Sequence, residues 1–226
     1  MSEPRTRLYL VTAPLAAPAG TAGAAIAAAL GAADVACLLL RMAPAAERDR
    51  KDLVKAIAPG VQERGTALLV EDPRLAAHTG ADGVHAAGAG DAFAAALDSL
   101  KPERIVGAGS LVSRDDAMRA GEAGADYVMF GDAGFAGPGP DPDDVVEQVG
   151  WWAEIFNVPC IGFARHLCEV EAIAAAGAEF VGLGDAIWAD PRGPAAAVAE
   201  ALAAIARAEA ALAAREVAGP MAGDRR

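Results

Sequence analysis

The stretch Thr66–Gly90, TALLVEDPRLAAHTGADGVHAAGAG, contains the pattern that decides the fold. It opens with an apolar run ending at Val70, whose length and branching are typical of a buried strand. Two acids follow, and Pro73 suits the first position of a helix, because its missing N–H costs no hydrogen bond there. Gly80 suits the end of that short helix, and a second strand is expected directly after it. The stretch predicts a β-α-β unit with carboxylates where its strands end.

The turn from helix to strand in this stretch occurs four times in the chain. In each copy a glycine ends an alanine-rich helical segment, an acid lies in the turn, and an apolar run begins. The copies begin at Gly31, Gly80, Gly124 and Gly177, which are 49, 44 and 53 residues apart. One β-α unit of a barrel takes about 25–30 residues, so each interval covers two units. The signature therefore predicts every second strand.

Filling the intervals gives eight strands and eight helices in alternation. We expect strands at about 8–12, 35–41, 66–70, 83–85, 105–107, 127–131, 160–163 and 180–184. We expect helices at about 21–30, 47–63, 73–79, 91–100, 113–123, 143–156, 167–176 and 194–215. This alternation predicts a parallel sheet covered by helices, and eight units favour a closed (β/α)8 TIM barrel. An open sheet is the weaker alternative, because no G-x-G-x-x-G follows the first strand.

Composition limits the classes of partner and the domain organisation. The 226 residues carry a net charge of −12, which argues against nucleic acid and anionic membrane surfaces as partners. No apolar run reaches the roughly 18 residues of a membrane span. The three cysteines (Cys37, Cys160 and Cys168) are an odd number beside apolar runs, so we expect reduced thiols in a cytoplasmic protein. One barrel domain is expected over 7–216, with disordered ends at 1–6 and 217–226.

Several strings resemble those of the thiamine phosphate synthase family, which includes the TenI-like thiazole tautomerases. LYLVT at Leu8–Thr12, GADGVH at Gly80–His85 and GADYV at Gly124–Val128 occur in that family's order and near its spacing. The resemblance covers about residues 8–205. It implies a TIM barrel and a transferase of thiamin biosynthesis, which joins an aminopyrimidine diphosphate to a thiazole phosphate with Mg²⁺ and releases pyrophosphate.

The resemblance also implies where the site residues lie. The third strand is followed by Glu71 and Asp72, of which one matches a Mg²⁺-associated aspartate, and Asp91 matches the second with one extra loop residue. Three residues at strand ends are the catalytic candidates: Arg41, which is retained from the family motif, Ser110 and His85. The phosphate group of the family falls on the ends of strands seven and eight, at Arg165, Gly184 and Asp185. We expect all of these, with Asp132, to line one end of the barrel.

The chain departs from the family pattern where phosphate is held. The second strand keeps Arg41 but lacks the neighbouring Gln and Lys of the family. The T-x-T-K phosphate clamp is replaced by GFAGPGP at 134–140, which has no lysine. A Gly-Gly pair becomes Ala164-Arg165, and V-V-S becomes Leu183-Gly184-Asp185. These replacements predict weak binding of thiazole phosphate and a synthase turnover far below that of a complete family member.

Each candidate residue also has a structural alternative. Asp72 and Asp91 can begin or cap helices, and Arg41 can form a salt bridge with Glu71. His85 can be a hydrogen-bonded packing residue, since no second ligand with metal spacing accompanies it. The adjacent pair Trp151-Trp152 allows a homodimer interface, with ordinary helix packing as its alternative.

Three functions remain open on these residues. The first is a Mg²⁺-dependent synthase of the family type, and the second is a catalytically degenerate or repurposed barrel that binds a small molecule. The third is another phosphate-handling TIM-barrel enzyme, which the fold alone permits. A Schiff-base aldolase is disfavoured, because no lysine lies at a predicted strand end.

Overall fold

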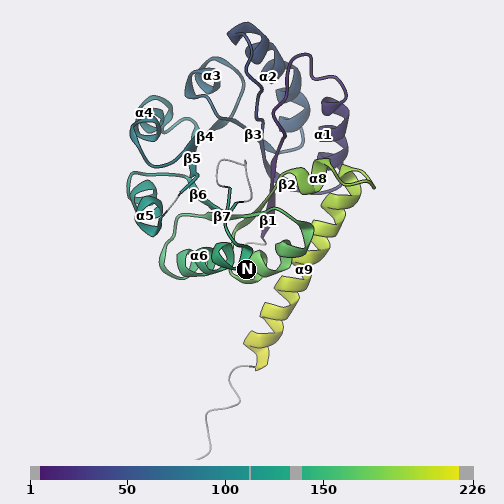
Figure 1. Cartoon of the computed structure of the whole chain (residues 1–226), viewed down its shortest axis with the longest axis vertical. Helices are drawn as coiled ribbons and strands as arrows, with labels where there is room; N and C mark the ends of the chain where they lie inside the picture. The colour runs from purple at the N-terminus through teal and green to yellow at the C-terminus, as the bar shows by residue number, and fades with distance from the viewer. Residues whose placement is uncertain (1–5, 112, 133–138, 219–226) are drawn as a thin grey trace, which may run out of the picture.

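The chain folds into a closed barrel of eight parallel strands that follow one another in sequence order (Figure 1). The computed structural model describes residues 6–111, 113–132 and 139–218. The strands are β1 (Arg7–Val11), β2 (Val35–Leu39), β3 (Ala67–Val70), β4 (Gly83–Ala87), β5 (Ile105–Gly109), β6 (Tyr127–Phe130), β7 (Cys160–Ala164) and β8 (Phe180–Leu183). The predicted (β/α)8 barrel is confirmed, and the open sheet is wrong.

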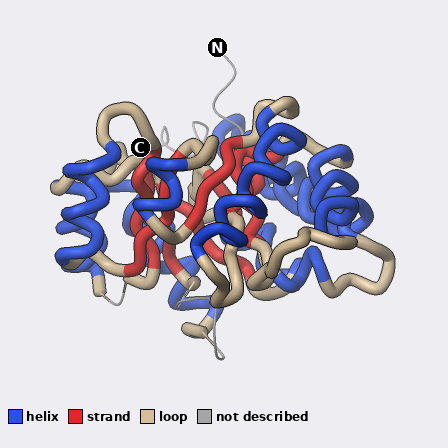
Figure 2. Tube along the Cα trace, turned by 90° about the horizontal axis from the view of Figure 1, so that it is seen from above, coloured by secondary structure: helices blue, strands red, loops and turns tan. Residues whose placement is uncertain are grey.

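Helices surround the strands on the outside of the barrel (Figure 2). They are α1 (Ala22–Gly31), α2 (Glu47–Gln62), α3 (Pro73–His78), α4 (Asp91–Leu100), α5 (Arg114–Glu122), α6 (Pro142–Ile155), α7 (Val170–Ala175), α8 (Asp185–Trp188) and α9 (Pro194–Ala218). A 3₁₀ turn, η2 (Leu167–Glu169), precedes α7. The four-residue helix α8 was not predicted. The long helix α9 packs against α1, α7 and α8 (Figure 1).

Described residues near both ends of the chain take part in the fold. Thr6 is held by two hydrogen bonds, from its N–H to Glu209 Oε1 (3.1 Å) and from its Oγ1 to the Ala178 carbonyl (3.0 Å). Helix α9 continues to Ala218, two residues past the predicted end of the domain. Residues 1–5 and 219–226 lie outside the described residues. The division into one domain and two disordered ends otherwise stays a prediction.

The repeated signature has a clear structural role. Its acid accepts a hydrogen bond from a backbone N–H of the preceding strand: Asp82 from Leu68 (2.7 Å), Asp126 from Val106 (2.7 Å) and Glu179 from Cys160 (2.8 Å). In the first copy Asp34 forms a salt bridge of 2.9 Å with Arg7 at the start of β1. The acid therefore joins the starts of neighbouring strands. The signature precedes β2, β4, β6 and β8, as predicted.

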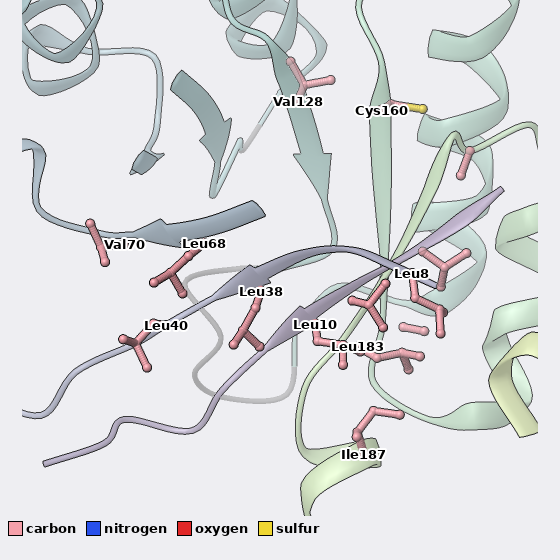
Figure 3. Close-up of a cluster of buried hydrophobic side chains, with 14 of the residues drawn as sticks. Leu8, Leu10, Leu38, Leu40, Leu68, Val70, Val128, Cys160, Leu183 and Ile187 are labelled. Atoms are coloured by element: carbon pink, nitrogen blue, oxygen red, sulfur yellow. The ribbon is translucent and has the colours of Figure 1, made fainter. Parts of the chain in front are cut away.

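The core has two layers because both faces of every strand are buried. Outward side chains such as Leu8, Leu38 and Leu68 pack against the helices, and Figure 3 shows part of this outer layer. Burying each such leucine contributes about 1.5–3 kcal/mol. Inward side chains, among them Leu69 and Phe163, fill the barrel interior.

The two adjacent tryptophans of α6 pack within the protein. Trp152 is fully buried and its indole N–H donates to the Val158 carbonyl (2.6 Å). Arg114 lies over the Trp151 ring, 4.7 Å from its centroid. These contacts account for both side chains by helix packing, and the homodimer stays a prediction.

Glycine in β5 makes room for polar side chains inside the barrel. Gly107 pairs in register with His85 on β4 and with Tyr127 on β6. A Cβ at Gly107 would lie 1.9 Å from Tyr127 Cζ, so only glycine fits there. The His85 and Tyr127 rings meet above Gly107, with centroids 5.8 Å apart and planes at 21°. This contact positions His85 inside the barrel.

Candidate functional site

The end of the barrel at which the strands finish, called the mouth below, holds most of the candidate side chains. Glu71 directly follows β3, Ser110 follows β5, and Arg165 follows β7. Arg41, Asp72 and Asp185 lie two residues past their strands, and Asp91 lies four residues past β4. Active sites of TIM barrels lie at this end. His85 is the exception: it lies in the middle of β4 with its side chain inside the barrel, because β4 runs two residues further than predicted.

The three predicted metal ligands have other partners or positions. Asp72 is the N-cap of α3, where its Oδ1 accepts from the N–H groups of Arg74 (2.9 Å) and Leu75 (3.3 Å). Its Oδ2 accepts from Arg50 Nη1 at 2.9 Å. Glu71 forms a salt bridge of 3.3 Å with Arg41. The structural alternatives for these acids are therefore realised.

Asp91 begins α4 without capping it. It is the first residue of α4, exposed to solvent, and the N-cap position belongs to Gly90, so the predicted cap is wrong. Within residues 6–111, 113–132 and 139–218, no three His, Cys, Asp or Glu side chains are grouped so that they can hold a metal ion. Mg²⁺ is commonly held by one or two carboxylates together with substrate phosphates and waters, so its site stays a prediction, and no step below depends on it.

Arg41 is fixed between two strands. Its backbone N–H donates to the hydroxyl of Thr12 (3.0 Å), a buried residue directly after β1. Its guanidinium is directed to Glu71, with 19% of the Arg41 side chain exposed. The Glu71 carboxylate offsets the positive charge that Arg41 would otherwise present to an anion at the mouth.

Ser110 and Asp132 form the most constrained contact at the mouth. Ser110 adopts a left-handed backbone conformation, with φ of +52°, which is uncommon for a residue with a side chain. Its N–H donates to both carboxylate oxygens of Asp132 (2.8 Å each), and its Oγ donates to Asp132 Oδ2 (3.2 Å). Asp132 is only 2% exposed. Strained backbone held by such bonds clusters at functional sites.

A chain of polar groups continues from Asp132 into the barrel. His85 Nε2 lies 3.6 Å from Asp132 Oδ2, and His85 Nδ1 lies 2.8 Å from the Tyr127 hydroxyl. The Tyr127 hydroxyl is 2.9 Å from that of Tyr9. Burial raises the pKa of both phenols well above the usual value, and their mutual contact contributes for Tyr9. Both phenols thus stay protonated donors at neutral pH.

Sequence reasoning missed the tyrosines and the role of Asp132. The alternation in β6 places Tyr127 and Met129 inward, which was the available signal. Cys37 also faces this interior, where burial raises the pKa of its thiol. A cavity of about 260 Å³ at the opposite end of the barrel is lined by Tyr9, Cys37, Tyr127 and Phe180, among others. It lies away from the mouth.

The predicted phosphate residues follow the neighbouring ends of β7 and β8, where Ala164 pairs with Leu183, and each has local contacts of its own. The guanidinium of Arg165 lies against Gly139, where a Cβ would come within 2.0 Å of Arg165 Nε. The backbone N–H of Arg165 donates to Glu169 Oε2 at 2.7 Å. Gly184 immediately precedes α8, and Asp185 is the exposed first residue of that helix. Of the replaced clamp at 134–140, residues 134–138 lie outside the described residues.

Comparison with known proteins shows the family to which this chain belongs. The family model described as thiamine monophosphate synthase matches residues 8–187. The chain belongs to this family. A thiamine-phosphate synthase of Rhodospirillum centenum is 39% identical over 198 residues, covering 86% of this chain and 95% of the relative. A thiamine-phosphate synthase of Hyphomonas neptunium is 33% identical over 204 residues, covering 87% and 92%.

A solved structure supports the fold of this thiamine monophosphate synthase family member. Thiamine phosphate pyrophosphorylase from Pyrococcus furiosus superposes with a TM-score of 0.74 over 91% of this chain and 98% of that protein, at 17% identity. At that identity the likeness concerns the fold. In the part of the chain that the structure describes, no helix is both long and apolar enough to cross a membrane. Cytoplasmic location stays a prediction.

Proposed function

We propose that the chain binds a small molecule of thiamin biosynthesis at its mouth and performs the synthase reaction of its family slowly or not at all. The observation that carries the proposal is that three carboxylates of the mouth and Arg41 already have partners within the protein. Asp72 is used by α3 and Arg50, Glu71 by Arg41, and Asp132 by Ser110. Groups that are already paired bind a diphosphate and its metal less well than free ones.

Electrostatics support the same conclusion. A carboxylate about 5 Å from one charge of a phosphate group costs roughly 3 kcal/mol at an effective dielectric of ~20, before screening. That cost corresponds to about two orders of magnitude in affinity. Asp132 lies at the mouth two residues past the end of β6, and Asp185 lies two residues past the end of β8. Arg165 is the cation that offsets part of this cost when its guanidinium turns from Gly139 to the ligand.

A second function is favoured by the comparisons. The relative from R. centenum is named a thiamine-phosphate synthase, and this chain matches 95% of its length at 39% identity. A complete synthase in this chain would have to rebuild its phosphate site around Arg41 and Arg165, the two arginines that follow β2 and β7. Catalysis would then consist of positioning and charge stabilisation of the departing pyrophosphate.

A synthase assay separates the two functions. Purified protein is mixed with aminopyrimidine diphosphate, thiazole phosphate and Mg²⁺, and thiamin phosphate formation is measured beside the R. centenum relative under identical conditions. We expect a turnover at least a hundredfold below the relative's. A turnover within a factor of ten of the relative's would refute slow catalysis and establish the second function.

A further inference from the structure

The hydroxyl of Ser110 is oriented by Asp132. Its proton is directed to Asp132 Oδ2 at 3.2 Å, while the Ser110 N–H is shared between both oxygens of the same carboxylate at 2.8 Å. A serine hydroxyl has one proton and two lone pairs. When the proton is committed to Asp132, the hydroxyl offers only lone pairs to a ligand.

The surroundings hold Asp132 in this arrangement. A Cβ at Gly109 would lie 2.3 Å from His85 Nε2 and 2.6 Å from Asp132 Oδ2, so the glycine allows both groups to approach the strand. The Tyr127 hydroxyl, a protonated donor, lies 2.8 Å from His85 Nδ1. When Nδ1 accepts from it, the Nε2 proton faces Asp132. The carboxylate accepts both protons of Ser110, whereas His85 Nε2, at 3.6 Å, makes an electrostatic contact with it rather than a hydrogen bond.

We propose that Asp132 makes Ser110 a hydrogen-bond acceptor, so that the mouth selects ligands that present an N–H or O–H donor to Ser110 over ligands that present a phosphate. The proposal rests on the proposed function, since it names the ligand class of the same site. Asp132 acts here as a positioning residue, and Ser110 is the group that contacts the ligand.

The hydrogen-bonding groups of the two ligand classes determine which class binds more tightly. A phosphate group is anionic at neutral pH, and its charged oxygens need hydrogen-bond donors. Ser110 cannot supply one while Asp132 holds its proton, and the buried carboxylate repels the anion. An amino group on a neutral heterocycle donates to the Ser110 lone pairs and meets no such repulsion. Aminopyrimidine alcohol is a ligand of this class.

Calorimetry with matched ligands and variants tests the proposal. Wild-type protein is titrated with aminopyrimidine alcohol, aminopyrimidine diphosphate and inorganic phosphate. We expect the alcohol to bind at least tenfold more tightly than the diphosphate. In Asp132→Asn the amide oxygen accepts the Ser110 N–H and the amide N–H₂ donates to Oγ, which turns the hydroxyl proton outward. We therefore expect affinity for inorganic phosphate to rise at least tenfold.

Controls separate this effect from a general change of charge. Asp98→Asn removes one charge from an exposed position of α4 and should leave all three affinities unchanged. Ser110→Ala combined with Asp132→Asn should lose the gain in phosphate affinity. Circular dichroism confirms that each variant is folded, and a variant that fails to fold is replaced by Asp132→Ser, for which the same gain is expected.

The outcomes distinguish this inference from the proposed function. If wild-type protein binds neither aminopyrimidine, the inference fails, whereas the proposed function is decided separately by the synthase assay. Otherwise the inference is decided by inorganic phosphate: a gain in Asp132→Asn that depends on Ser110 supports it. Equal phosphate affinities in wild type and Asp132→Asn, or a gain that persists without Ser110, would overturn it.

Discussion

Replacing Asp72 by alanine removes one of the two carboxylates, Glu71 and Asp72, of which the family pattern assigns one to a metal. The structure uses Asp72 to begin a helix. As the N-cap of α3 it accepts two backbone hydrogen bonds, which contribute about 1 kcal/mol. Its 2.9 Å salt bridge to Arg50 joins side chains 32% and 30% exposed, and solvent screening limits it to about 0.5–1 kcal/mol. We expect a loss of about 1.5–2 kcal/mol in the free energy of unfolding.

Urea denaturation followed by circular dichroism measures this loss, and thermal unfolding should show a decrease of about 5 °C, since 1 kcal/mol is about 2–4 °C for a protein of this size. Asp91→Ala is the matched control: an exposed acid without a capping bond should change stability by less than about 0.5 kcal/mol. Millimolar Mg²⁺ should leave both midpoints unchanged. A wild-type midpoint that rises with Mg²⁺, and ceases to do so in Asp72→Ala, would show that Asp72 is a metal ligand.

Three further predictions concern the barrel interior and the thiols. Gly107→Ala should lower the free energy of unfolding by about 3 kcal/mol, because its Cβ would overlap the Tyr127 ring. Gly60→Ala, with open space around its Cβ, should not lower it. Equal denaturation midpoints for the two variants would contradict this. The pKa of Tyr127 is raised in the folded state, so above about pH 10 the native protein binds more protons than the unfolded chain. The free energy of unfolding should therefore fall as pH rises through this range, and fall less in Tyr127→Phe. Parallel pH profiles of the two proteins would contradict this. Of the three cysteines, only the exposed Cys168 should react quickly with a thiol reagent in the folded protein, and rapid reaction of a second cysteine would contradict this.

The barrel could be predicted from the sequence because its repeated acids have a local role. Asp82 and Asp126 accept from a neighbouring strand's backbone, so the same short string precedes alternate strands. Both faces of the strands are buried, which produces the continuous apolar runs. Helix α8 was missed because four residues carry too little periodicity to be distinguished from a loop.

The candidate site was predictable in position but only partly in chemistry. A salt bridge between Arg41 and Glu71 was one of the two alternatives for Arg41, and it forms. The contact between His85 and Asp132 depends on the absence of a side chain at Gly109, and on the register between three strands. Such tertiary conditions leave no mark on a single stretch of sequence. Asp132 was therefore expected only to line this end of the barrel, and its hydrogen bonds with Ser110 were not expected.

Calorimetric titration with thiazole phosphate tests the central claim, that the mouth's charges are paired and leave no strong phosphate site. We predict that the wild-type protein binds thiazole phosphate weakly, with a dissociation constant in the millimolar range or above, and that Arg165→Ala changes it little. Micromolar binding that is lost in Arg165→Ala would show that a phosphate clamp has been rebuilt around that arginine and would contradict the claim.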